Sequence, residues 1–236
     1  RATEAAAFIK AQETIQPLGY GLAFEQYQLS QTTADLALFK HLMNGREANA
    51  IHLVNFYLSI GATESAKTVL AQCDSQGAMT CIYQAYLSDD YASADVDLKT
   101  DVKTGVKTSV ATNVTTWLDT AAETFADNVL FPNTLTEIGV LDAFPDHYFT
   151  QYLLGCFFYA KRNYSRAVRH WEQVLHLNPD YAPVLRNLSV YAYNKCKDSQ
   201  KAIDLMSRAF ALSSDDARIL YELDFLYQAV ATEPTT

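Results

Sequence analysis

Glycine and proline are scarce in this sequence, with 8 glycines and 6 prolines among its 236 residues. A chain with so few turn-forming residues is poorly suited to many β-turns, so the composition favours long helices over an all-β fold. The cysteines show no Cys-x-x-Cys spacing. We therefore expect Cys73, Cys81, Cys156 and Cys196 to be buried free thiols, which are typical of a reducing cytoplasm.

Basic residues are also few. The sequence has 18 lysines and arginines against 27 aspartates and glutamates, which gives a net charge of −9. This balance argues against a nucleic-acid or anionic-membrane surface, which requires a basic patch. The longest apolar run, Tyr152 to Ala160, is far too short to span a membrane. No signal peptide is recognisable and the chain begins with Arg1, so we expect a fragment or processed product of a cytoplasmic protein.

What the chain does contain is a clear pattern of two helices and a tight turn between Tyr148 and Asp180. Gly155 in the first helix lacks a Cβ, which lets the second helix approach closely. Ala167 is the matching small residue of the second helix, and Trp171 follows one turn later to fill the groove between the two. Pro179 ends the second helix because it has no backbone donor.

The same pattern returns further along the chain. Ser189 lies 34 residues after Gly155, whereas Ala202 lies 35 residues after Ala167. The turn between the two helices of this second copy has therefore gained one residue, which we place near residues 196–198.

Met206 takes the place of Trp171 in the second copy. The first helix of a third copy follows, with Leu220, Leu223 and Tyr227. The copies resemble the tetratricopeptide repeat (TPR), a helix–turn–helix unit of about 34 residues. The resemblance implies an all-α fold, namely a TPR-like α-solenoid of stacked antiparallel helix pairs in a right-handed superhelix, closed by a C-terminal capping helix. An unrelated helical bundle is the alternative.

Further helical patterns precede this region. We expect helices over Thr3–Ile15, Tyr20–Leu29, Asp35–Met43, Ala78–Leu87, Trp117–Phe125 and Thr134–Ala143. Between the third and fourth of these lies a degenerate repeat. Its first helix carries Leu53 and Tyr57, Gly61 makes the turn, and Ala66 and Leu70 face back from the second helix.

A stretch rich in threonine and valine has an apolar residue at every fourth position. These residues are Leu98, Val102, Val106, Val110, Val114 and Leu118. Their stripe favours a helix, although threonine and valine lower helix propensity and a mobile loop is the alternative. We accordingly predict degenerate TPR-like repeats over residues 1–98, an insert or linker over 99–116, and TPR repeats with the capping helix over 117–236.

Several segments together resemble a bacterial family of TPR proteins in which an uncharacterised mutarotase-like β-sandwich domain lies upstream of the helices. The resembling segments are Phe131-Pro132, Glu137 to Leu141, Tyr152 to Gly155, His170 to Glu172, Arg186 to Leu188 and Leu220 to Asp224. They cover roughly the last half of the chain. The resemblance implies a link to carbohydrate metabolism without a defined activity, and nothing near Arg1 indicates β-strands.

No motif of nucleotide binding, zinc-dependent hydrolysis or serine hydrolysis is present. Among the five histidines, His170 and His176 are six residues apart and fall on different helix faces, so we expect neither metal nor cofactor. The acidic pairs Asp89-Asp90 and Asp215-Asp216 lie at helix starts, where the macrodipole favours them. We therefore expect this chain to be non-catalytic.

The predicted functional surface is the groove lined by the first helices of the repeats. Its candidate binding residues are Tyr152, Cys156, Tyr159, Arg186, Asn187, Tyr193, Asn194, Tyr221 and Phe225. Aromatic rings with an arginine and amides suit a peptide, by stacking and hydrogen bonding. Arg186 and Asn187 instead brace adjacent helices under the alternative interpretation.

Two hypotheses for function follow. The first is a non-catalytic protein-interaction or scaffold module that binds a protein or peptide segment, or its own upstream domain. The second is the helical accessory part of a carbohydrate-active or sugar-binding protein whose active domain lies upstream. Oligomeric state does not follow from the sequence.

Overall fold

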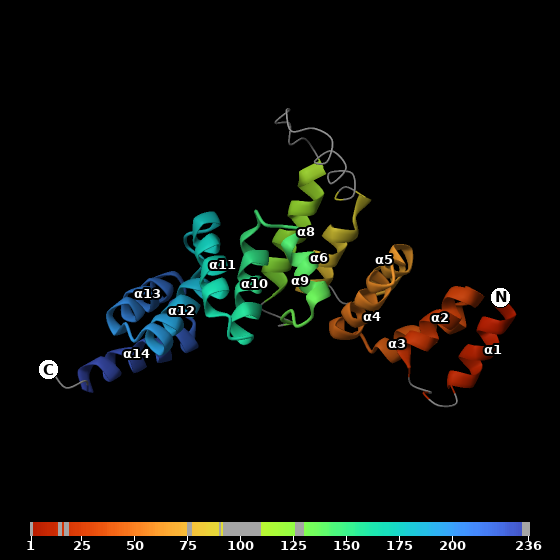
Figure 1. Cartoon of the computed structure of the whole chain (residues 1–236), viewed down its shortest axis with the longest axis horizontal. Coiled ribbons are helices and arrows are strands. Elements are labelled where there is room, and N and C mark those ends of the chain that lie inside the picture. Colours follow the sequence, from red (N-terminus) through yellow and green to blue (C-terminus); the bar gives the residue numbers. More distant parts are fainter. Residues whose placement is uncertain are drawn as a thin grey trace. The chain divides into compact units, whose positions relative to one another are not determined.

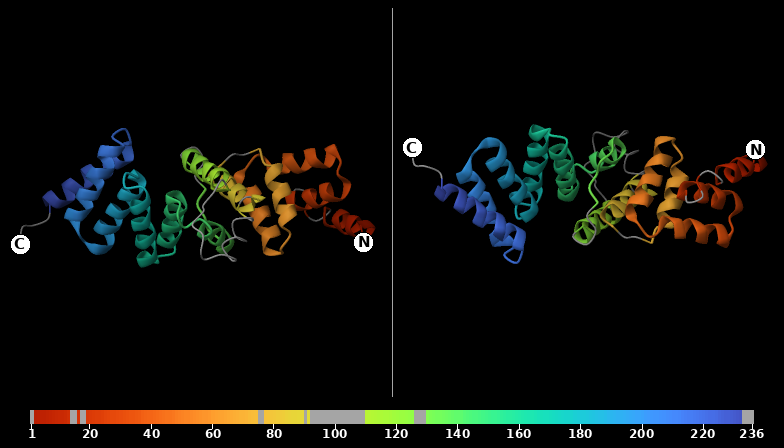
Figure 2. Two further views of the ribbon diagram at one scale, coloured as in Figure 1. Left: turned by 90° about the horizontal axis from the view of Figure 1, so that it is seen from above. Right: turned by 90° about the horizontal axis from the view of Figure 1, so that it is seen from below.

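The computed structural model describes residues 2–13, 16, 19–74, 77–89, 91, 110–125 and 130–232. Within these ranges every regular element is a helix and no strand occurs, as Figure 1 shows. The predicted all-α class is confirmed. Consecutive helices pack against each other as pairs, namely α2 with α3, α4 with α5, α6 with α8, α10 with α11 and α12 with α13. Figure 2 shows the same pairs in two further views.

The chain divides into two compact units. The first comprises residues 1–130 and 134–140, and the second comprises residues 131–133 and 141–236. Helix α8 (Val110–Thr124) is thus grouped with the helices before it. It runs without interruption across position 116, where we drew the end of the insert from the sequence. Residues 98–109 of the Thr/Val stripe lie outside the described residues. Domain limits at 98 and 116 stay a prediction.

Among the described residues of the first unit, six helices precede α8. They are α1 (Ala2–Glu13), α2 (Tyr20–Ser30), α3 (Thr33–Met43), α4 (Glu47–Ser59), α5 (Thr63–Ala71) and α6 (Ala78–Leu87). Helix α3 begins at the N-cap Thr32, whose hydroxyl accepts from the backbone N–H of Asp35, and it ends at Asn44 in the left-handed conformation. The predicted turn at Gly61 has a φ of 73°, which glycine adopts without strain.

An aromatic cluster forms the core of the first unit around Phe24. This side chain is fully buried, and its ring centroid lies 4.9 Å from that of Phe39 and 5.5 Å from that of Tyr57. The Tyr57 hydroxyl donates to Glu25 Oε1 over 2.6 Å, so the buried ring keeps a hydrogen-bond partner. Leu53, Tyr57, Ala66 and Leu70 are all buried, which confirms their predicted places inside a helix pair.

A buried carboxylate joins α4 to the start of α6. Glu47 Oε1 accepts from the backbone N–H of Thr80 over 2.7 Å and from the Thr80 hydroxyl over 3.2 Å. The first N–H groups of a helix lack partners within the helix, so this carboxylate satisfies a donor that would otherwise be unpaired. Gly77, the N-cap of α6, leaves room for it, because a Cβ there would overlap the Glu47 carboxylate.

Replacing Glu47 with glutamine is expected to alter how stability depends on pH. Burial raises the pKa of Glu47 and outweighs the hydrogen bonds from Thr80. Because folding raises this pKa, the Glu47 side chain contributes most to stability below its ordinary pKa of about 4.3. The contribution is lost as the pH rises through the pKa of Glu47 in the folded state. We expect urea unfolding to show that the free energy of unfolding of the wild type, relative to that of Glu47→Gln, is larger at pH 5 than at pH 7. A larger difference at pH 7 than at pH 5 would contradict a raised pKa of Glu47.

Helix α9 (Leu135–Asp142) begins with a reciprocal cap. The Glu137 backbone N–H donates to the Thr134 hydroxyl over 3.2 Å, while the Thr134 backbone N–H donates to Glu137 Oε2 over 2.8 Å. The other carboxylate oxygen of Glu137 lies 3.5 Å from Asn55 Nδ2 in α4. The helix therefore starts where the sequence predicts it.

The helices of the second unit also pack against their neighbours along the chain. They are α10 (Tyr148–Ala160), α11 (Tyr164–Leu177), α12 (Ala182–Tyr191), η1 (Ala192–Cys196), α13 (Ser199–Leu212) and α14 (Ala217–Thr232). Trp171 is 2% exposed between α10 and α11, and Ala167 is fully buried. A Cβ added at Gly155 would overlap the Trp171 indole. The close approach predicted at Gly155 is thus confirmed.

The extra residue of the second repeat is taken up as a π-helical turn, η1. The two repeats leave their first helix in the same way, through a left-handed residue followed by an N-cap. These residues are Arg162 and Asn163 in the first repeat, and Lys197 and Asp198 in the second. Since the left-handed residues are 35 apart, the insertion lies before Lys197 and within η1. The predicted position, residues 196–198, is a little too far along the chain.

Candidate functional site

The second unit contains a cleft of about 240 Å³ between α12, η1, α13 and α14. Its lining residues are Arg186, Ser189, Val190, Tyr193, Asn194, Met206, Glu222, Phe225 and Leu226. Met206, Ser189 and Leu226 are buried, while Asn194 and Phe225 are exposed. The cleft thus reaches from the interior of the second repeat to its surface, along the face formed by the first helices α12 and α14.

Two residues of the cleft lining correspond in sequence to the indole contact of the first repeat. Met206 stands in the position of Trp171, and its unbranched side chain occupies less width than the indole rings. Ser189 stands in the position of Gly155, and its hydroxyl donates to the Ala202 carbonyl over 2.6 Å. This bond ties α12 to α13 without an indole between them.

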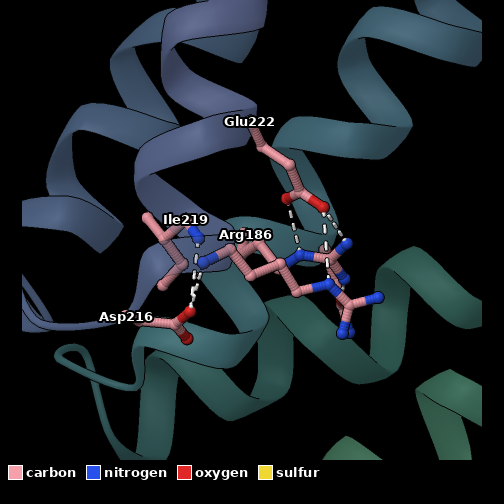
Figure 3. Close-up of polar contacts among 6 residues, drawn as sticks. Arg186, Asp216, Ile219 and Glu222 are labelled. Atoms are coloured by element: carbon pink, nitrogen blue, oxygen red, sulfur yellow. Dashed lines mark hydrogen bonds and ion pairs between the residues drawn. The ribbon is translucent and has the colours of Figure 1, made fainter.

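An ion pair between two residues of the cleft lining joins α12 to α14, as Figure 3 shows. Arg186 Nε donates to Glu222 Oε2 over 2.7 Å, and Arg186 Nη2 donates to the other carboxylate oxygen. Their side chains are only 21% and 22% exposed, so the two-point contact is partly shielded from water. The bonds to Glu222 raise the pKa of Arg186. The guanidinium therefore braces two helices rather than standing free for a ligand.

The start of α14 is fixed beside this ion pair. Asp216 Oδ1 accepts from the backbone N–H groups of Arg218 and Ile219, over 2.8 Å and 3.3 Å (Figure 3). Arg218 Nε also lies 3.6 Å from Glu222 Oε1. The cap thus fixes where α14 begins, while the ion pair holds α14 against α12.

Two aromatic rings form the walls near the mouth of the cleft. The ring centroids of Tyr193 and Phe225 are 5.8 Å apart with an interplanar angle of 86°, an edge-to-face arrangement. Tyr193 belongs to η1, so the π-helical turn positions one of these walls. π-Helical turns are frequent at functional sites. Asn194, the next residue, brings an exposed side-chain amide to the same cleft.

The structure brings four of the predicted groove residues together in this cleft: Arg186, Tyr193, Asn194 and Phe225. Tyr221 is exposed on α14 and is absent from the lining. Ser189, Met206, Glu222 and Leu226 line the cleft although the sequence analysis did not select them. Of these, Met206 carried a signal, because a methionine in place of a tryptophan leaves volume unfilled.

The other predicted residues take part in packing around α10. Tyr152 is only 7% exposed, and its ring centroid lies 5.3 Å from that of Tyr181. Asn187 Nδ2 lies 3.7 Å from Cys156 Sγ, which ties α12 to α10. Burial raises the pKa of Cys156 to about 12, so this thiol stays protonated at neutral pH.

Tyr159, the remaining candidate, lies half-buried near the end of α10. Its ring centroid is 5.3 Å from that of Trp171 and 5.2 Å from that of Tyr164. The four residues packed around α10 thus bind helices together and present little free surface.

The described cysteines are all free thiols, as predicted, but they differ in burial. Cys81 is buried, Cys73 and Cys156 are partly buried, and Cys196 is exposed. The predicted burial is therefore wrong for Cys196. Cys196 is the last residue of η1 and lies next to Lys197, the left-handed residue of the turn into α13.

His170 has structural partners in helix α10. Its Nδ1 lies 2.8 Å from Gln151 Oε1, and its ring stacks on Phe158 with a centroid distance of 5.2 Å. Burial lowers the pKa of His170. Among the residues that the structure describes, no cluster of three or more histidine, cysteine or acidic side chains could hold a metal ion.

Each of the described helices is too short or too polar to span a lipid bilayer. No protein-family model matches the chain.

Proposed function

We propose that this chain is a non-catalytic protein-interaction module of TPR type, and that the cleft between α12 and α14 binds an extended peptide segment of a partner. The cleft carries the proposal, because it joins exposed aromatic and amide groups to a buried apolar floor. Peptide sites commonly combine an apolar anchor pocket with a few placed polar groups.

The two copies of the repeat support the TPR-type assignment. Each first helix carries a small residue, Gly155 or Ser189, where the second helix crosses. Each turn uses a left-handed residue and a side-chain N-cap, with Asn163 accepting from the Arg166 backbone N–H and Asp198 from that of Lys201. We propose that these pairs stack as a right-handed α-solenoid and that α14 caps the stack.

The residues that line the cleft are held in fixed positions, which supports a role in binding. The ion pair between Arg186 and Glu222 fixes the distance between α12 and α14, and the hydroxyl of Ser189 fixes α12 on α13. Because the walls of the cleft are already held in place, little conformational entropy of the protein is lost when a peptide binds. An extended segment can therefore gain affinity from a few side chains placed in it.

Selection of peptides from a random display library tests this function. Two variants of α14 form a matched pair, because Phe225 and Tyr227 are 49% and 52% exposed and only Phe225 lines the cleft. We expect selected peptides to lose at least about tenfold in affinity for Phe225→Ala, as for a contact at the centre of an interface. Their affinity for Tyr227→Ala should be unchanged. Equal losses, or no selected peptide at all, would contradict the proposal.

A further inference from the structure

We propose that the cleft recognises one neutral aromatic side chain, of phenyl or indole size, as the anchor residue of the bound peptide. This inference rests on the proposed function and states its chemistry. Three independent observations support it, namely the volume of the cleft, the charges of its lining and the packing of the first repeat.

The volume selects a single large side chain. The cleft measures about 240 Å³. Sites for cofactors and drug-sized ligands span roughly 300–1,000 Å³, so this space is small for such molecules. An apolar protein cavity of about 150 Å³ holds benzene. The cleft is therefore large enough for one aromatic ring system.

The lining favours a neutral occupant. Its charged residues, Arg186 and Glu222, neutralise each other through two hydrogen bonds. The remaining lining side chains are apolar, aromatic, hydroxyl or amide groups. A lysine or glutamate entering the cleft would lose water without gaining a free opposite charge, which is unfavourable. A neutral side chain meets no such penalty.

The first repeat shows how these helices accommodate an aromatic ring. There the indole of Trp171 fills the space beside Gly155, and the ring of Tyr159 lies 5.3 Å from it. In the second repeat the corresponding residues, Met206 and Ser189, line the cleft together with the Tyr193 and Phe225 rings. An aromatic side chain from a partner would meet ring edges and faces together with a methionine sulfur, and both contacts are favourable.

Titration of the intact chain with short peptides tests the anchor chemistry. The probes are acetyl-Gly-Gly-X-Gly-Gly-amide peptides in which X is Trp, Phe, Leu, Lys or Glu, and backbone amide chemical shifts report binding. We expect the Trp and Phe peptides to shift the amides of residues 189–194 and 225–226, with affinity about tenfold above that of the Leu peptide. The Lys and Glu peptides should leave these amides unshifted.

Two variants locate the effect. Met206→Trp places an indole in the cleft from within, so it should abolish the shifts, while Met206→Leu conserves volume and should keep them. Phe225→Ala should weaken the Trp peptide about tenfold with Tyr227→Ala unchanged, which gives a second test should Met206→Trp fail to fold. Persistence of the Trp-peptide shifts in a folded Met206→Trp variant would overturn the proposal.

The outcomes separate this inference from the proposed function. If the Lys or Glu peptide binds the same amides more tightly than the Trp peptide, the aromatic anchor is wrong and the peptide-binding cleft stands. The aromatic anchor is equally wrong if library-selected peptides bind at the cleft without an aromatic residue. If neither selected peptides nor these probes shift the cleft residues, both proposals fail.

Discussion

Replacing Trp171 with alanine is expected to lower the free energy of unfolding of the second unit by about 3–5 kcal/mol, the usual cost of deleting a large aromatic side chain from a core. The indole is 2% exposed and is enclosed by Gly155 and the Tyr159 ring. No neighbouring side chain can collapse into so large a space without moving a helix. Urea unfolding followed by circular dichroism measures the loss, and a change under about 0.5 kcal/mol, as for a surface site, would refute the packing.

A double-mutant cycle with Gly155 shows whether the loss comes from this contact. In wild type, Gly155→Ala should destabilise by about 1–3 kcal/mol, because its methyl group overlaps the indole. In the Trp171→Ala background the same methyl group meets open space. It should then be neutral or stabilising by up to about 1 kcal/mol, since alanine is the better helix former. Additive effects would place the two residues out of contact.

Phe24→Ala is expected to destabilise the first unit by a similar amount, about 3–5 kcal/mol. Its ring is fully buried at the junction of α2, α3 and α4, against Phe39 and Tyr57. Removing it takes away the common partner of both rings, so the loss includes a cavity and two aromatic contacts. Denaturant unfolding gives the magnitude, and residue-level hydrogen exchange shows where the protection is lost.

Phe8 provides the control for this substitution. It is an exposed phenylalanine in α1 of the same unit. Phe8→Ala should change stability by no more than about 0.5 kcal/mol, as is usual for surface sites. If the two alanine variants were equally destabilised, burial would not explain the effect at Phe24. Loss of exchange protection should be concentrated in α2, α3 and α4.

Much of the fold was predictable because small and large residues recur at helical spacing. Gly155, Ala167 and Trp171 define one helix pair by sterics alone, and the structure packs them as predicted. The helix ends at Thr134 and Asn44 likewise follow from local chemistry, a capping box and a left-handed residue. Such features depend on neighbours within a few residues, which the sequence displays directly.

The site was less predictable because it depends on contacts between distant residues. Sequence alone leaves two roles open for Arg186, ligand binding or bracing, and only the structure pairs it with Glu222 in another helix. Tyr152 shares a helix face with groove positions, yet Tyr181 covers it. Gln151 is buried with His170 as its partner. The helical periodicity of a sequence does not reveal which side chains of other helices bury a given helix face.

The π-helical turn η1 gives the scaffold a means to diversify. A residue inserted into an α-helix would ordinarily rotate everything after it by about 100°, since each residue turns the helix by that angle. Here the extra residue is absorbed within Ala192–Cys196, and α13 still begins after the same left-handed residue and N-cap as α11. An evolving repeat can therefore acquire a different surface by a single-codon insertion while its helix packing stays intact.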